Sequence, residues 1–191
     1  MEAADRFRIV VVCTGNRFRS PLAEHILRRE TVGLPVSVRS VGVLDLGGIE
    51  ALPEALEAAE ELGLDLSAHR TCVLAPEPLE GADLVVGFER AHVARAVVAG
   101  GAPLERTFTL PELVELLPPE PPAGEEDPVA RARALVASVA VGRIDPRTAS
   151  VPELADPLGH SPSFFLRTAE QVDKLTRRLV TQLFGSPEAP T

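Results

Sequence analysis

The chain has 191 residues, a length that fits one domain, and its 45% hydrophobic and 25% charged residues predict an ordinary buried core. Its formal net charge of −9 argues against broad binding of nucleic acid, which needs a basic surface. No apolar run reaches the length of a membrane span, and no cleavable signal precedes the first apolar run. We therefore expect a cytoplasmic protein without membrane or nucleic-acid partners.

Strands and helices alternate along the predicted chain. A β-branched run over 8–12 has no polar alternation and predicts a strand buried on both faces. Further strands are predicted over 36–41, 83–87 and 106–109. Helices are predicted to begin at Ser20, the expected N-cap, and over 53–62, 89–99, 111–117, 128–141 and 163–184, the last with Phe164 and Leu166 on its apolar face. This order predicts an α/β fold with an open four-stranded parallel sheet and helices on both faces.

One segment interrupts the alternation. Residues 118–127 are rich in Pro and Glu and are predicted to be exposed and irregular. An Ala-rich helix is predicted directly after them, over 128–141. We expect residues 118–141 to be an insertion within a single domain that spans residues 1–191.

The loop after the first strand carries the clearest chemistry. It reads Cys13-Thr14-Gly15-Asn16-Arg17-Phe18-Arg19-Ser20-Pro21. Five residues separate Cys13 from Arg19, and a loop of that length can wrap a tetrahedral oxyanion with its backbone N–H groups. The guanidinium of Arg19 can hold two phosphate oxygens, and the helix that follows adds its positive end. We therefore predict a phosphate-binding loop at the carboxyl end of the first strand, where such sheets bind ligands.

Cys13 lies at the base of this predicted loop. The amides and the helix end favour its thiolate, which is a nucleophile, and the hydroxyl of Ser20 could donate to the sulfur or hold the loop. The alternative is an inert, buried thiol. The order of strand, Gly-containing loop, Arg19 and Ser-Pro helix start favours the reactive cysteine.

The residues around this loop have a familiar arrangement. The run Val12-Cys13-Thr14-Gly15-Asn16-x-x-Arg19-Ser20-Pro21-Leu22-Ala23-Glu24 resembles the signature of the low-molecular-weight protein tyrosine phosphatases. The resemblance extends over nearly the whole chain, through 40–42, 67–70, 108–110, 155–159 and the closing helix, and is clearest for bacterial members, especially the protein arginine phosphatase branch. It implies a cysteinyl-phosphate on Cys13 and phosphate binding by Arg19 together with Thr14, Gly15, Asn16, Arg17, Phe18 and Ser20.

The resemblance also implies roles for residues outside the loop. Asp156 would be the general acid that protonates the leaving group. The alternative is a purely structural role as a turn residue before a proline. Glu89 and Glu153 are its nearest rivals. Ser40 and His69 would form a hydrogen-bonded set with Asn16 that shapes the loop, although His69 could instead be a surface or cap-like histidine.

The chain departs from the family pattern at three places. Phe18 stands where the family usually has a second cysteine, so no protective disulfide can form there and Cys72 is the only candidate partner. Arg17 would make the pocket mouth more positive and could favour acidic or doubly phosphorylated substrates, or could be a solvated loop residue. Leu44, Leu46 and Leu158 replace aromatic walls, which predicts a wider pocket that is less selective for a flat ring.

The leading interpretation is a hydrolase of phosphotyrosine or a related phosphomonoester, on a protein or a small molecule, with inorganic phosphate as product. A protein arginine phosphatase with the same machinery is the alternative. An arsenate reductase is disfavoured because it needs a further cysteine where this chain has Glu89, and a non-catalytic phosphate-binding module because Cys, Arg and Asp are all present. No cofactor is expected, and the scattered His25, His92 and His160 suggest no metal site.

Overall fold

Four parallel strands form the sheet of this computed structural model, which describes residues 6–122, 126–142 and 151–185. The strands are β1 (Phe7–Cys13), β2 (Val36–Gly42), β3 (Leu84–Gly87) and β4 (Thr107–Thr109), arranged in the order β2-β1-β3-β4. Each overlaps a strand predicted from the sequence. The predicted α/β fold with an open four-stranded parallel sheet is confirmed.

The central strand β1 is buried on both faces. Successive side chains of a strand point to opposite faces, so Phe7, Ile9 and Val11 enter the larger core while Val10 and Val12 enter a second, smaller one. β2 and β3 flank the strand on either side and complete its hydrogen bonding. This position explains why the sequence shows a continuous apolar run rather than alternation.

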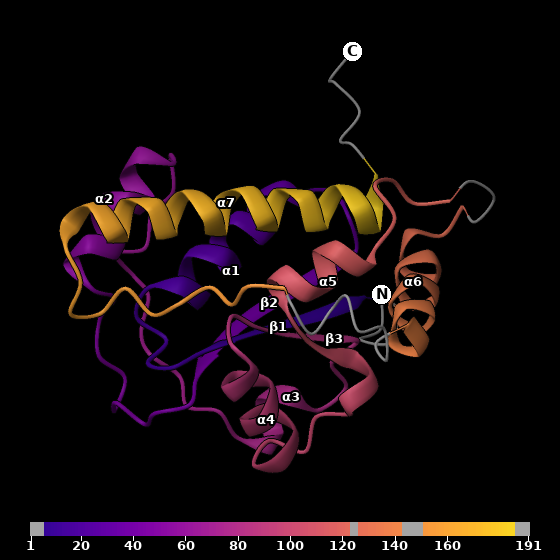
Figure 1. Cartoon of the computed structure of the whole chain (residues 1–191), viewed down its shortest axis with the longest axis horizontal. Coiled ribbons are helices and arrows are strands. Elements are labelled where there is room, and N and C mark those ends of the chain that lie inside the picture. The colour runs from indigo at the N-terminus through magenta and orange to yellow at the C-terminus, as the bar shows by residue number, and fades with distance from the viewer. Residues whose placement is uncertain (1–5, 123–125, 143–150, 186–191) are drawn as a thin grey trace.

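Helices cover both faces of the sheet, as predicted (Figure 1). One face carries α1 (Arg19–Glu30), α2 (Pro53–Glu61), α5 (Leu110–Leu116) and α7 (Pro162–Phe184), and the other carries α3 (Pro76–Leu79) and α4 (Arg90–Val98). A single 3₁₀ turn, η2 (Leu104–Arg106), precedes β4. Long α7 lies across α1, and this pair anchors the larger core.

The helix predicted within the irregular region is α6 (Pro128–Gly142). Its buried face, including Val129 and Leu135, joins the larger core, and Arg133 Nε donates to Asp83 Oδ1 at 2.8 Å. Asp83 precedes β3, so α6 packs at the edge where the strands begin, opposite the end that carries Cys13 (Figure 1). Residues 118–122 and 126–127 form no helix or strand, which agrees with the predicted irregular segment.

Two helices differ in register from the prediction. α1 begins at Arg19 with Phe18 at the N-cap, so the prediction that Ser20 caps this helix is wrong, because its hydroxyl turns back toward the end of β1. In α7, Phe165 is buried whereas Leu166 is 43% exposed. A shift of one residue turns a helix by about 100°, which moves Leu166 off the apolar face.

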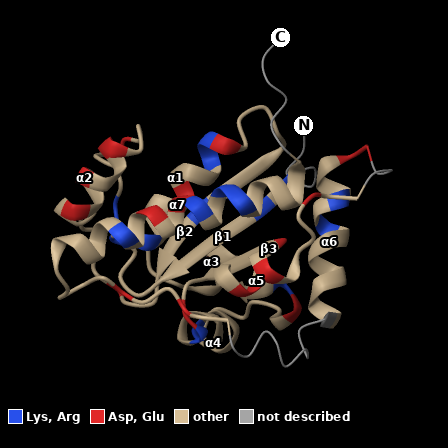
Figure 2. Cartoon of the chain, turned by 45° about the horizontal axis from the view of Figure 1, so that its top comes forward, with Lys and Arg blue, Asp and Glu red and all other residues tan. Residues whose placement is uncertain are grey.

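Basic and acidic residues are interspersed along the elements of the cartoon in Figure 2. α2 carries glutamates at four of its nine positions, and α7 carries both basic and acidic residues. Among the described helices, none combines the length and apolar character needed to cross a bilayer.

Candidate active site

Cys13 ends β1 and is only 3% exposed. The chain then turns through residues 14–18 before α1 begins, and Cys13 together with this segment forms the predicted phosphate-binding loop. Two main-chain hydrogen bonds fix its start: Val43 N donates to Cys13 O and Leu44 N donates to Thr14 O, both at 2.9 Å. The loop thus continues the pairing of β1 with β2 beyond the strands.

Two hydrogen-bonding groups converge on the sulfur of Cys13. The backbone N–H of Asn16 donates to Sγ at 3.2 Å, and the hydroxyl of Ser20 lies 3.0 Å from Sγ. Because Asn16 Nδ2 donates to the same hydroxyl oxygen at 2.9 Å, the Ser20 proton is left to point toward the sulfur or toward Val41 O, at 3.5 Å. Donors placed in this way stabilise negative charge on the sulfur.

Asn16 holds the loop together from inside. Its backbone adopts φ of 52°, a conformation that is costly for a residue other than glycine, and its side chain is fully buried. Nδ2 donates to Ser20 Oγ and to Ser40 Oγ (2.8 Å), while Oδ1 accepts from the backbone N–H of Cys72 at 2.9 Å. These side-chain bonds offset the backbone strain.

The structure brings together Asn16, Ser40 and His69, as the resemblance implied. His69 Nε2 lies 2.7 Å from Asn16 O, so this nitrogen must carry the proton that the carbonyl accepts. Partial burial lowers the pKa of His69, which favours its neutral form. Ser40 Oγ in turn donates to the carboxylate of Glu24, a buried residue of α1 that the sequence analysis did not single out. A lone acidic residue within the buried face of a predicted helix was the available signal.

Gly42 lets the loop lie against β2. A Cβ atom there would come within 2.9 Å of both Asn16 N and the carbonyl carbon of Gly15. Those contacts are with backbone atoms, which cannot swing aside as a flexible side chain could. Only glycine therefore permits this close approach.

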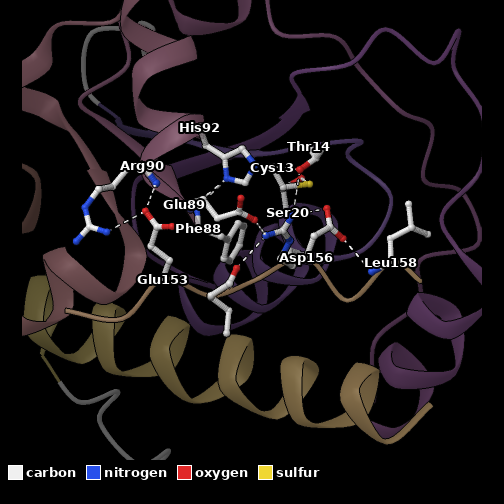
Figure 3. A network of polar contacts seen from close by, with 12 residues as sticks. Cys13, Thr14, Ser20, Phe88, Glu89, Arg90, His92, Glu153, Asp156 and Leu158 are labelled. Atoms are coloured by element: carbon white, nitrogen blue, oxygen red, sulfur yellow. Dashed lines mark hydrogen bonds and ion pairs between the residues drawn. The ribbon is translucent and has the colours of Figure 1, made fainter. Parts of the chain in front are cut away.

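The guanidinium of Arg19 is 1% exposed and makes four polar contacts, three of them with Thr14, Glu89 and Asp156, which are labelled in Figure 3. Nη1 donates to the carboxylate of Glu89 and to Leu154 O at 2.8 Å. Nη2 donates to Thr14 Oγ1 at 3.1 Å and to Asp156 Oδ2 at 2.5 Å. Arg19 therefore joins the phosphate-binding loop to two segments that are distant in sequence, and these contacts compensate the burial of its charge.

Asp156 reaches the pocket, as predicted, and also serves its local turn. Oδ1 accepts from Leu158 N at 3.1 Å, while Oδ2 binds Arg19. The segment is anchored by Leu154, whose N–H donates to Phe88 O at 3.0 Å. Asp156 is therefore a turn residue that also borders the pocket, and its role as general acid stays a prediction.

The rival carboxylates are placed differently. Glu153 Oε1 accepts from the backbone N–H of Arg90 at 2.7 Å and from its Nη1 at 3.1 Å, and it does not line the pocket that holds Cys13 (Figure 3). Glu89 is paired with Arg19 and is likewise absent from the pocket lining. Only Asp156 among the three borders this pocket.

Cys13 and Asp156 border the same cavity, of about 240 Å³. Its lining consists of Cys13, Thr14, Gly15, Arg17, Phe18, Arg19, Leu44, Leu46, Ile49, Leu52, Asp156 and Leu158. Leu44, Leu46 and Leu158 were predicted to form walls, whereas Ile49 and Leu52 were not identified from the sequence. Arg17 lies at this pocket with its Nε donating to Glu50 O at 3.0 Å. No cluster of His, Cys, Asp or Glu suited to a metal ion occurs in the described ranges.

Phe18 turns its side chain into the core. Its ring packs edge-on against Phe165 of α7, with ring centroids 5.1 Å apart. The residue borders the pocket, but the aromatic ring belongs to the interface between the loop and α7. Both cysteines are free thiols, Cys13 buried and Cys72 exposed, and Cys72 touches the loop through its backbone.

His92 belongs to the network but was not predicted to. Nδ1 accepts from the backbone N–H groups of Phe88 (3.3 Å) and Glu89 (3.2 Å), and Nε2 lies 3.1 Å from Thr14 Oγ1. Burial lowers its pKa to about 4, and the nearby charge of Arg19 contributes. The spacing of Glu89 and His92 is that of a helix capping box, which was the signal available in the sequence.

Comparison with known proteins agrees with this site. The profile of the family described as "Low molecular weight phosphotyrosine protein phosphatase" matches residues 8–138. The "Protein-arginine-phosphatase" of Bacillus subtilis (strain 168) is 30% identical over 177 residues, which are 92% of this chain and 95% of that protein. The "Probable low molecular weight protein-tyrosine-phosphatase EpsP" of Ralstonia nicotianae is 40% identical over 84 residues, 44% of this chain and 57% of that protein.

A solved structure shares the fold over most of its length. The "Crystal structure of YwlE mutant from Bacillus subtilis" superposes with a TM-score of 0.69 at 30% identity, covering 93% of this chain and 98% of that one. The chain therefore belongs to the low molecular weight phosphotyrosine protein phosphatase family, and it is a phosphatase.

Proposed function

We propose that this phosphatase hydrolyses phosphotyrosine or a related aryl phosphomonoester through a phosphate ester of Cys13, and that it releases inorganic phosphate. One observation carries the proposal: Cys13, with two hydrogen-bonding groups at its sulfur, shares a small pocket with Arg19 and Asp156. These are the three parts that the chemistry needs, namely a nucleophile, a cation for the phosphate oxygens and a proton donor.

The reaction runs in two displacements. The thiolate of Cys13 attacks phosphorus, the S–P bond forms, and the P–O bond to the leaving group breaks as Asp156 donates its proton to that oxygen. Water then attacks phosphorus while the carboxylate of Asp156 takes its proton, and the S–P bond breaks to release phosphate. Arg19 and the N–H groups of the phosphate-binding loop hold the non-bridging oxygens in both steps.

The contact between Asp156 and Arg19 has to open during this cycle. Asp156 Oδ2 occupies a position at Nη2 that a phosphate oxygen would take. When a phosphate dianion binds Arg19, it replaces this carboxylate, and Asp156 is freed to face the leaving-group oxygen. Leu154 remains bonded to Arg19 and Phe88, so the loop keeps its anchor while Asp156 moves.

The pocket walls favour an aromatic leaving group. Leu44, Leu46, Ile49 and Leu158 offer hydrocarbon surface that a phenyl ring can bury, although aliphatic walls select a flat ring less strictly than aromatic walls would. Arg17 places a positive charge at the same pocket, and that charge opposes a second guanidinium such as the one in phosphoarginine. Both features favour phosphotyrosine, and the charge also suits acidic neighbours in a substrate.

Protein-arginine phosphatase activity is the second candidate. The observation in its favour is the match to the Bacillus subtilis protein of that name along nearly the full length of both chains. Paired peptides that carry phosphotyrosine or phosphoarginine in the same flanking sequence separate the two candidates by their ratio of kcat/KM. Arg17→Gln should shift that ratio toward phosphoarginine, whereas Arg70→Gln, at an exposed arginine outside the pocket lining, should leave it unchanged.

Covalent chemistry at Cys13 is tested by trapping. Rapid quenching during turnover should leave phosphate on Cys13, and Cys13→Ser should lose turnover of every substrate. Cys72→Ser removes the other thiol and should retain activity. Substantial turnover by Cys13→Ser, or a trapped phosphate at another residue, would overturn the proposal.

We further propose cytoplasmic substrates, a phosphorylated protein or a small phosphomonoester, and no partnership with nucleic acid or membranes. The net charge of −9 and the interspersed surface charges support this part. The assignment of residues 118–141 as an insertion within one domain stays a prediction.

A further inference from the structure

Thr14, directly after the nucleophile, has an unusual set of hydrogen-bond partners. Its Oγ1 accepts from Arg19 Nη2 at 3.1 Å, because a guanidinium can only donate. The same oxygen lies 3.1 Å from His92 Nε2, and in that second contact either atom could in principle be the donor. Which of them donates decides where the hydroxyl proton of Thr14 points.

The other nitrogen of His92 settles the direction. Nδ1 faces the backbone N–H groups of Phe88 and Glu89, at 3.3 and 3.2 Å, and both of these groups can only donate. Nδ1 must therefore be unprotonated, and a neutral imidazole then carries its proton on Nε2. His92 donates to Thr14, so Oγ1 accepts from both His92 and Arg19.

The O–H bond of Thr14 then has to point in a third direction, away from His92 and Arg19. Within the described part of the chain, Oγ1 contacts no acceptor. Thr14 lines the pocket beside Cys13 and Arg19, where a phosphate oxygen would be the natural acceptor. A hydroxyl held in this way needs no reorientation when an oxyanion arrives.

We propose that His92 is a positioning residue for this phosphatase: it fixes the rotation of the Thr14 hydroxyl so that the proton is donated to a phosphate oxygen in the Cys13 pocket. The inference rests on the proposed function, since it assigns a further donor to the same site. It adds one side-chain hydrogen bond to those that the loop amides and Arg19 provide.

The local fold keeps His92 in place. The residue is 3% exposed and lies in the first turn of α4, where the capping box with Glu89 fixes the ring. A Cβ atom at Gly87 would lie 2.7 Å from the Cβ of His92, so the absence of a side chain at Gly87 makes room for the imidazole. The His92 ring thus links the end of β3 and the start of α4 to the pocket wall at Thr14.

A double-mutant cycle on turnover and orthovanadate inhibition tests the coupling. Thr14→Val should weaken vanadate binding and kcat/KM by roughly tenfold or more, the usual cost of a lost hydrogen bond to a charged group. Thr14→Ser, which keeps the hydroxyl, should recover most of that loss. His92→Leu should cause a similar loss, and His92→Gln, which keeps a donor near Nε2, should recover part of it. In the Thr14→Val background, His92→Leu should cost little more.

A matched control and two further outcomes complete the cycle. Thr31→Val removes a buried hydroxyl at the far end of α1 and should leave both measurements unchanged. Additive effects of Thr14→Val and His92→Leu would overturn the proposal, because His92 would then act independently of Thr14. The proposal is also wrong if Thr14→Val alters the pH dependence of Cys13 alkylation, since the hydroxyl would then serve the sulfur rather than phosphate.

The tautomer can be read without turnover, which separates this proposal from the proposed function. Nitrogen-15 NMR of the wild-type protein, with the His92 signals assigned through His92→Gln, should show a neutral ring protonated at Nε2 from pH 7 to 5. Inorganic phosphate should bind wild type about tenfold more tightly than Thr14→Val, even if every organic substrate tested is inert. A ring protonated at Nδ1, or equal phosphate affinity, would refute the role of His92.

Discussion

The phosphate-binding loop and the late loop around Asp156 border the same pocket but are held in different ways. The first is fixed by short bonds among buried groups, with Asn16 joined to Ser20, Ser40 and His69. The late loop contacts Arg19 and bonds through its main chain to Phe88, and Glu153 pairs with Arg90 at the surface. Asp156 is more than a third exposed. The proposed phosphate site thus lies among buried, hydrogen-bonded groups, whereas the proposed proton donor lies on a more exposed segment.

This difference has a chemical reason. A ring of donors for an oxyanion must not relax when charge develops, because its value lies in being preorganised. A general acid has to approach leaving groups of different shapes and then turn to a water molecule. We therefore expect the two loops to differ in rigidity as their proposed tasks differ.

The largest expected effect on turnover comes from a change in the late loop, at Asp156. Asp156→Asn should slow substrates with poor leaving groups by about 10²–10⁴-fold, the usual loss for a general acid, and should matter much less for a nitrophenyl ester. Affinity for inorganic phosphate should persist, because Cys13 and Arg19 remain. Steady-state kinetics on an alkyl and a nitrophenyl phosphate, with phosphate as inhibitor, check this, and an equal loss on both substrates would contradict it.

Acid should lower the stability of the folded protein through His92, which contacts the phosphate-binding loop at Thr14. Its pKa of about 4 in the folded protein lies below the reference value of 6.5, so the unfolded chain binds the proton first as the pH falls. The free energy of unfolding should therefore drop between about pH 6.5 and pH 4, by about 3 kcal/mol from this residue. Arg19 opposes the proton, while Glu89, Asp156 and Glu153 partly favour it.

Urea unfolding at several pH values measures that loss. His92→Gln has no titrating ring, so its stability should fall less over the same interval than that of wild type. The other titrating groups are shared by both proteins, and the difference between the two curves isolates His92. Parallel curves for wild type and variant would show that His92 does not cause the loss.

Ser40→Ala tests the hydrogen bonds that support the phosphate-binding loop through Asn16. The change removes one buried hydrogen-bond partner from Asn16 and one from Glu24, which should lower the free energy of unfolding by about 2 kcal/mol. Activity on a nitrophenyl ester should fall as the loop loosens. Urea unfolding and kinetics measure both, with Ser138→Ala, at an exposed position of α6, as the control that should change neither.

The smallest effect is expected at Glu153. Its pair with Arg90 is exposed, so Glu153→Gln should cost at most about 1 kcal/mol of stability. Turnover of a poor leaving group should stay within a few-fold of wild type, because Glu153 does not border the pocket. If this variant were crippled while Asp156→Asn worked normally, the acid would have been assigned to the wrong residue.

Sequence patterns predicted the phosphate-binding loop better than the late loop around Asp156. The buried strand, the glycine-containing loop and the helix start are contiguous, so local rules were enough to place Cys13 and Arg19. Asp156 was placed by family resemblance and by the rule that loops at the carboxyl ends of parallel strands converge. Its direct contact with Arg19 depends on side-chain packing, which no sequence spacing encodes.

Other features were missed for physical reasons. His92 and Glu24 act through single hydrogen bonds to residues far away in sequence, and nothing periodic marks them. Ile49 and Leu52 became pocket walls because the segment after β2 folds back over the loop. Short α3 spans only four residues, too few to produce a helical period.

The edge-on contact between Phe18 and Phe165 ties the phosphate-binding loop to α7, the last helix of the described chain. During synthesis the nucleophile leaves the ribosome early, whereas the ring that backs its loop arrives only after almost all other elements. Contacts between residues so far apart in sequence form late and slow the folding of small domains. We therefore expect a partly synthesised chain to carry Cys13 before its pocket is complete, and to gain phosphatase activity only after α7 docks.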